Sequence, residues 1–159
     1  MDLVSHSAFE RLAPTPGRYA TMPIAEAFDW ASCADGAGAG EWYLVCFRSV
    51  RQPGADEALL QALDDLAHLE ASTAPGFVHY FKGQTTEHGE CLSFCLWDSR
   101  AQARAAAGRP AHAQASAVVH QMYASYTLEF YRVTRAPGSP SFEFELYDRP
   151  ATPDHTRLS

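Results

Sequence analysis

The chain has 159 residues, which is enough for one domain whose core needs neither disulfides nor a structural metal. Its 12 basic and 19 acidic side chains give a net charge of -7, and Lys82 is the only lysine. We therefore expect no basic surface that could neutralise nucleic-acid phosphates or attract an anionic membrane.

The sequence also lacks the features of a secreted or membrane-spanning protein. No run of about 18 apolar residues is present, and the N-terminus has neither the basic segment nor the apolar core of a signal peptide. Three of the four cysteines lie in apolar, strand-like runs, which favours reduced, buried thiols over a disulfide framework. We expect a cytoplasmic protein.

The composition divides the chain into three parts. Residues 1–40 are rich in proline, glycine and alanine, with one short apolar piece around Phe28 and Trp30, and are predicted to be an N-terminal arm. Residues 41–135 carry the periodic apolar patterns of a domain. Residues 136–159 are predicted to be a tail, in which the alternating segment 142–147 could add an edge strand to this chain or to a partner.

The first half of the central domain reads as a strand followed by a helix. Residues 41–50 are strand formers that are apolar on both alternating faces, as in a strand covered on both sides. Residues 55–72 have helical periodicity, and the predicted buried stripe contains Leu59, Leu63, Leu66 and Ala67.

The second half contains a hairpin, a helical region and a last strand. Residues 77–82 and 91–97 are predicted strands joined by a longer loop. Ser99 and Gln102 form a capping box for a short helix over 100–107, a further helix is predicted from Pro110, and residues 126–133 return to strand composition.

This order of elements predicts an α+β fold of the ferredoxin-like βαββαβ type, with helices on one face of the sheet. The first and third strands are apolar on both faces, so the second face also needs a cover. We expect a second copy of the same sheet to supply it, giving a homodimeric α+β barrel.

Residues 41–135 resemble the antibiotic biosynthesis monooxygenase-like family of dimeric α+β barrels. The resemblance rests on four short motifs: Pro75-Gly76-Phe77, Leu96-Trp97-Asp98-Ser99, Pro110-Ala111-His112 and Glu129-Phe130-Tyr131-Arg132-Val133.

The resemblance implies a range of functions, since members of that family include cofactor-free oxygenases of polycyclic phenols, quinol oxygenases, heme-degrading enzymes and domains with no known reaction. The heme-degrading members use an asparagine on the first strand, and this chain contains no asparagine. We therefore do not expect heme degradation by that machinery, and we expect no cofactor.

Two histidines are candidate proton acceptors in a cleft between sheet and helices. His79 lies in the second strand, on a face that the alternation assigns to Phe77 and Phe81, and a neutral imidazole there could take a phenolic proton. His112 follows Pro110 near a helix start, where the helix dipole lowers an imidazole pKa. Each could instead be a histidine with a purely structural role.

Five further side chains are candidates for binding a substrate. Their rings, hydroxyls or charge could stack on an aromatic ligand, bond its carbonyl or stabilise an oxyanion, although core packing or surface ion pairs are the commoner roles of such residues. They are Trp42, Arg48, Tyr80, Trp97 and Tyr123. No standard zinc spacing and no glycine-rich nucleotide loop is present, so we expect no metal site.

The sequence thus predicts a homodimer with a cleft for a small hydrophobic or aromatic ligand. The first hypothesis for its function is a cofactor-independent, monooxygenase-like enzyme acting on a small aromatic or polyketide-like molecule. The alternative is a non-catalytic dimer that binds a ligand or a partner protein, which would be favoured if Phe28 or Trp30 filled the cleft.

Overall fold

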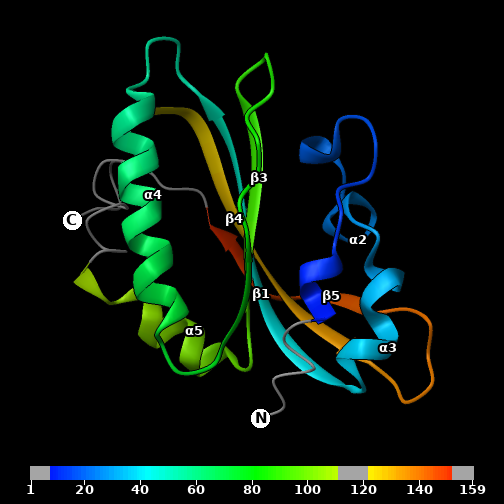
Figure 1. Ribbon diagram of the computed structural model, residues 1–159. Coiled ribbons are helices and arrows are strands. Elements are labelled where there is room, and N and C mark those ends of the chain that lie inside the picture. Colours follow the sequence, from blue (N-terminus) through cyan, green and yellow to red (C-terminus); the bar gives the residue numbers. More distant parts are fainter. Residues whose placement is uncertain (1–7, 111–121, 152–159) are drawn as a thin grey trace.

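The computed structural model describes residues 8–110 and 122–151, and a five-stranded antiparallel sheet runs through their centre (Figure 1). The neighbouring strands lie in the order β2-β3-β1-β4-β5. The bounds are β1 (Gly40–Arg51), β2 (Phe77–Phe81), β3 (Glu90–Trp97), β4 (Tyr123–Arg135) and β5 (Glu143–Ala151). The first four strands have the ferredoxin-like arrangement, so the predicted α+β fold class is confirmed, and β5 pairs with β4 of the same chain.

Two helices cover one face of the sheet, on the left in Figure 1: α4 (Glu57–Ser72) and α5 (Arg100–Ala107). Both begin at capping residues that the sequence contains. The side chain of Asp56 accepts a hydrogen bond from the backbone N–H of Leu59 at 3.0 Å, and Ser99 Oγ accepts one from the N–H of Gln102 at 3.2 Å. These bonds satisfy backbone donors that the first helical turn leaves free.

The buried stripe of α4 differs from the predicted one. Leu60 and Leu63 are buried, whereas Leu59 and Leu66 are 40% and 52% exposed. The inner face carries Leu60, Leu63 and Ala67, so the predicted stripe is right at Leu63 and Ala67, whereas Leu60 is buried in place of its neighbour Leu59. Three leucines, Leu59, Leu66 and Leu69, therefore lie exposed on the outer side of the helix.

Residues 8–37, which we name the N-terminal segment, lie on the opposite face of the sheet from α4 (Figure 1). The segment consists of short helical pieces. The 3-10 helices are η1 (Phe9–Arg11), η2 (Tyr19–Thr21) and η3 (Trp30–Cys33), and the α-helices are α2 (Ile24–Ala27) and α3 (Ala34–Ala37).

The N-terminal segment buries the second apolar face of the sheet. The Phe28 ring meets Phe81 and Phe94 with ring centroids 4.8 and 5.2 Å apart, in edge-to-face arrangements. This cluster also contains Leu44, Cys46, Leu92, Leu96 and Val133 of the sheet. The expectation that a second copy covers this face is corrected, because the chain covers it with its own residues.

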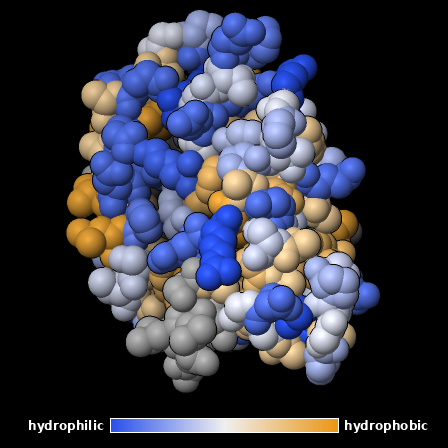
Figure 2. All heavy atoms as spheres, turned by 45° about the vertical axis from the view of Figure 1, so that its right-hand side comes forward, coloured by the Kyte–Doolittle hydropathy of each residue, from blue (hydrophilic) through white to orange (hydrophobic). Residues whose placement is uncertain are grey.

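The surface on the side of the N-terminal segment is mixed in character. Figure 2 shows hydrophilic residues spread between smaller hydrophobic areas, as expected where an apolar sheet face is already covered.

Within residues 8–110 and 122–151, none of the helices is long and apolar enough to span a bilayer. All four cysteines have free thiols.

Candidate functional site

A cavity of about 790 Å³ lies between the sheet and the helices α4 and α5. Alternate residues of a strand point to opposite faces, and Tyr43, Val45 and Phe47 of β1 point into this cavity. Their neighbours Trp42 and Leu44 point to the N-terminal segment. The two-sided apolar pattern of β1 thus serves two different layers of one chain.

The cavity walls are mainly apolar and aromatic. Helix α4 contributes small side chains at its centre, which leaves room above the sheet. The apolar lining residues include Tyr43, Val45, Phe47, Leu60, Leu63, Ala67, Phe77, Trp97, Ala103, Ala106, Leu128 and Phe130.

A hydrogen-bonded polar group interrupts these walls where β2 faces α4. Tyr80 Oη donates to Asp64 Oδ1 at 2.8 Å, and Lys82 Nζ lies 3.4 Å from Asp64 Oδ2. Burial, followed by the charge of Asp64, raises the pKa of Tyr80 far above its ordinary value. Tyr80 therefore stays a neutral donor at all physiological pH values. The His68 ring packs against the Tyr80 ring with a centroid distance of 4.4 Å, on the exposed side of this group.

Two thiols and a second tyrosine add neutral polar groups. Burial raises the pKa of Cys95 to about 11 and that of Tyr123 to about 12, and it raises the pKa of Cys91 as well. Cys95 Sγ accepts a hydrogen bond from Trp97 Nε1 at 3.1 Å. Both thiols are therefore protonated near neutral pH and unsuited to act as nucleophiles.

At another edge of the cavity, Asp148 connects three elements. It accepts a hydrogen bond from Tyr43 Oη at 2.5 Å and two from Arg100, at 2.8 and 2.9 Å. The Arg100 guanidinium holds the pKa of the Asp148 carboxyl below its ordinary value. The carboxylate thus joins β5 to β1 and α5 beside the cavity.

The structure brings three of the predicted site residues to the cavity. Tyr80, Trp97 and Tyr123 all line it. Trp97 is buried and packs edge-to-face on Phe77 at 5.6 Å, so its ring forms part of the wall. Of the three, Tyr80 is the one whose polar group is already engaged by a carboxylate.

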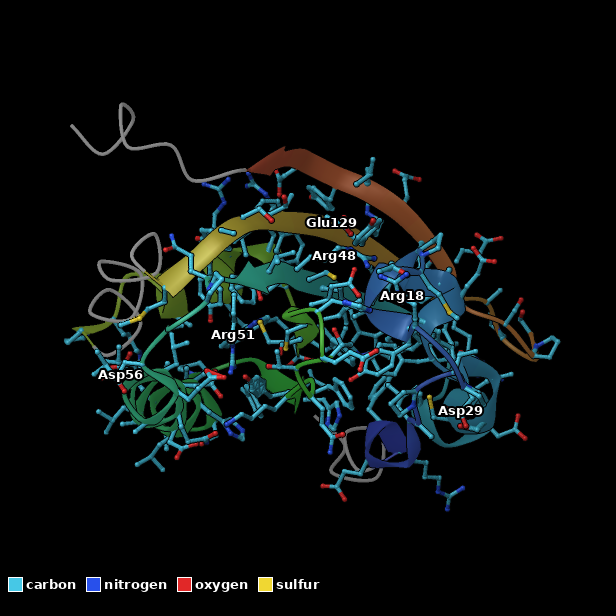
Figure 3. The ribbon with its side chains drawn as sticks, turned by 90° about the horizontal axis from the view of Figure 1, so that it is seen from above. Arg18, Asp29, Arg48, Arg51, Asp56 and Glu129 are labelled. Carbon is cyan, nitrogen blue, oxygen red and sulfur yellow. The ribbon has the colours of Figure 1, made fainter. Side chains whose placement is uncertain are left out.

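Three other predicted residues lie on the opposite side of the sheet. Trp42 packs against Phe9 at 5.4 Å. Arg48 donates to Glu129 at 3.1 Å and to the carbonyl of Ala20 at 2.9 Å, and Figure 3 shows it with Glu129 on the side of the N-terminal segment. These residues help to fix the N-terminal segment to the sheet.

His79 is the third of these residues, and a β-bulge explains its position. The register of β2 against β3 shifts between Phe77 and His79, so His79 pairs with Leu96 and its ring faces Phe94 at 6.0 Å. Burial lowers the pKa of this imidazole. The strict alternation assumed from the sequence put Phe77 and His79 on one face, which is wrong. The other candidate histidine, His112, lies outside the described residues.

Asp64 and His68 are cavity residues that the sequence interpretation missed. They are four residues apart, so they share one face of α4. Two polar side chains four residues apart, on a helix that covers an apolar sheet, could have indicated polar groups in the cavity. The predicted buried stripe did not include them because it placed Leu59 and Leu66 on the inner face of the helix. Among the described residues, no group of three or more histidine, cysteine or acidic side chains is arranged to hold a metal.

Comparison with solved structures shows the same fold in small proteins. Rv0793 from Mycobacterium tuberculosis is 20% identical, covers 62% of this chain with 98% of its own length, and has a TM-score of 0.51. A protein from Caulobacter crescentus, described provisionally as an antibiotic biosynthesis monooxygenase, is 20% identical over 60% of this chain and 92% of its own, with a TM-score of 0.49. The likeness to Rv0793 confirms the predicted fold.

The sequence comparisons extend over more of the chain. UPF0643 protein PB2B2.08 from Schizosaccharomyces pombe is 29% identical over 145 residues, which cover 80% of this chain and 66% of that protein. The matched region thus spans just under two thirds of the relative's length. The family model described as PB2B2.08-like matches residues 1–146, so the match includes the N-terminal segment as well as the sheet. The chain belongs to the PB2B2.08-like family.

Proposed function

We propose that the protein binds a small aromatic or polyketide-like molecule in the cavity and acts on it as a monooxygenase-like enzyme. The observation that carries the proposal is the cavity itself: about 790 Å³, walled by aromatic and aliphatic side chains, with hydrogen-bonding groups gathered at its edges. Small-molecule sites in proteins commonly have this combination of apolar walls and few polar groups.

The proposed reaction converts an activated ring CH₂ group, as in an anthrone, to a carbonyl. A base removes a proton from the CH₂ carbon, the resulting carbanion reduces and binds O₂, and the peroxide loses water, so that one oxygen atom enters the product and one leaves in water. Of the described residues that line the cavity, His68 is the one imidazole, and we assign it as proton acceptor in place of His79. The neutral Tyr80 hydroxyl donates its proton to Asp64, so its oxygen can accept a hydrogen bond from a substrate hydroxyl.

Oxygen uptake with anthrone and quinol substrates tests this proposal. We expect His68→Gln to lower kcat/KM about 100-fold or more, because proton transfer by a positioned base typically contributes a factor of that size. His79→Gln is the matched control, since it makes the same change on the other face of the sheet and should leave the rate within about twofold. Equal rate losses in both variants, or none in either, would remove His68 from the mechanism.

A non-catalytic ligand-binding protein is the second candidate. It is favoured by the position of His79 outside the cavity and by the exposure of His68 at its rim. Phe28 and Trp30 pack on the opposite face and do not fill the cavity. Binding of an anthrone without any oxygen uptake would support this second candidate.

We also propose a homodimer and a cytoplasmic location. The sheet face first considered for the dimer is occupied by the N-terminal segment, so a second copy needs another surface. The exposed leucines of α4 offer one, since Leu59, Leu66 and Leu69 are spaced along its outer side. The four free thiols support the proposed cytoplasmic location, because the cytoplasm keeps thiols reduced.

A further inference from the structure

The outer side of α4 carries a stripe of exposed apolar side chains. Leu59, Ala62, Leu66 and Leu69 follow one another at intervals of three, four and three residues, so they lie along one side of the helix. The leucines are 40%, 52% and 66% exposed, in that order, and Ala62 is exposed too. Single exposed leucines are ordinary on protein surfaces, whereas a row of them indicates an interaction surface.

This stripe serves neither the core nor the cavity. Helix α4 covers the sheet with its other side, through Leu60 and Leu63, and none of the four stripe residues lines the cavity. Figure 1 shows α4 on the side of the molecule away from the N-terminal segment. The intervals of three and four residues are those of the a and d positions of a heptad, the pattern of a helix that packs against a second helix. Because α4 spans 16 residues, it offers a little over two heptads of this pattern.

The charges beside the stripe are all acidic. With the stripe residues at a and d, Asp65 falls at a g position and Glu70 at an e position, one on each side of the stripe. Helix α4 contains no lysine or arginine. The nearby Lys82 lies 3.8 Å from Asp65 and 3.4 Å from Asp64, so one cation is shared between two carboxylates. The Asp65 side chain is 66% exposed and accessible to a partner.

We propose that the outer side of α4 is a docking surface for a helix of another protein, one with leucine-like side chains at its a and d positions and lysine or arginine beside them. In paired helices the charges at e and g decide which partner is accepted. A second copy, for which the same leucines offer a surface, would place Asp65 against the copy's Glu70 in a parallel pair and against the copy's Asp65 in an antiparallel pair. Charge therefore favours a basic partner. The inference goes beyond the proposed function, because it concerns a surface outside the cavity.

Fluorescence anisotropy with two labelled synthetic peptides tests this proposal on the full-length protein. Both peptides have about three heptads with leucine at a and d, and they carry either lysine or glutamate at e and g. We expect the lysine peptide to bind at least tenfold more tightly than the glutamate peptide, and this preference should shrink when salt is raised from about 0.05 to about 0.5 M.

A matched pair of variants locates the binding surface. Leu66→Gln should weaken binding of the lysine peptide at least tenfold, because it places a polar group in the centre of the stripe. Leu146→Gln on β5 is the control, since this leucine is 56% exposed and lies outside α4, and it should change the affinity less than about twofold. Leu69→Gln replaces Leu66→Gln if that variant does not fold.

Three results would overturn the proposal. Equal affinity for the two peptides would contradict the role of the acids. Equal effects of Leu66→Gln and Leu146→Gln would show that the peptide binds elsewhere. A dimer in sedimentation velocity that Leu66→Gln dissociates, and that the lysine peptide does not displace, would assign the stripe to a second copy. None of these results bears on the cavity, whose ligand is tested separately.

Discussion

At the scale of single residues, Asp148 shows how the C-terminal strand is tied to the rest of the molecule. It accepts hydrogen bonds from Tyr43 of β1 and from Arg100 of α5. The sequence could not predict this contact, because the partners lie about 50 and 100 residues away and β5 follows a proline-containing turn. The alternation of residues 142–147 predicts a strand, but it does not indicate that the carboxylate of Asp148 binds the guanidinium of Arg100.

Replacement of Asp148 by asparagine should show how this contact depends on pH. Because the folded-state pKa of Asp148 is lowered, its ionised form contributes stability above the unfolded value near 4, and the contribution is lost as pH falls through the lower folded pKa. In urea denaturation, Asp148→Asn should cost on the order of 1 kcal/mol at pH 7. The difference from the wild type should shrink toward zero by about pH 2. Glu143→Gln on the same strand should have little effect at either pH, and a difference that does not change with pH would contradict the role of the charge.

At the scale of elements, the sequence predicted the strands and the helices α4 and α5 well and their faces less well, while the further helix predicted from Pro110 lies outside the described residues. Ser99 marks the start of α5 as predicted, α4 begins two residues after its predicted start at residue 55, and every strand of the central domain is present within a few residues of its predicted bounds. A β-bulge turns His79 away from Phe77, and such a one-residue shift leaves no compositional trace in a strand that is apolar on both sides. Of the predicted site residues, Tyr80, Trp97 and Tyr123 therefore line the cavity, whereas others lie on the opposite face of the sheet.

The N-terminal segment should behave as part of the core and not as a removable extension. Phe28 is 4% exposed, and its ring contacts those of Tyr19, Trp30, Phe81 and Phe94. Phe28→Ala should therefore lower the free energy of unfolding by about 3–5 kcal/mol in chemical denaturation. Leu146→Ala is the control, because this side chain on β5 is 56% exposed, and the expected change is within about 0.5 kcal/mol. A Phe28 effect as small as that of Leu146 would mean that the segment does not stabilise the sheet.

At the scale of the whole molecule, three layers come from one chain: α4 and α5, the sheet, and the N-terminal segment (Figure 1). The two-sided strands correctly indicated that both faces are buried. They could not indicate what buries the second face, because the covering pieces are only three or four residues long and therefore carry little helical periodicity. The cavity is thus confined to the face covered by α4 and α5.

The central claim is that this cavity holds one small aromatic molecule per chain, and native mass spectrometry with added 2-naphthoate tests it most directly. Ala67→Trp places an indole in the cavity from α4, while Ala62→Trp makes the same change on the exposed side of that helix. We predict one bound naphthoate per chain in the wild-type protein and in Ala62→Trp, and none in Ala67→Trp. The same spectra give the number of subunits and so test the proposed homodimer. Binding that persists unchanged in Ala67→Trp, or no binding to the wild-type protein, would contradict the claim.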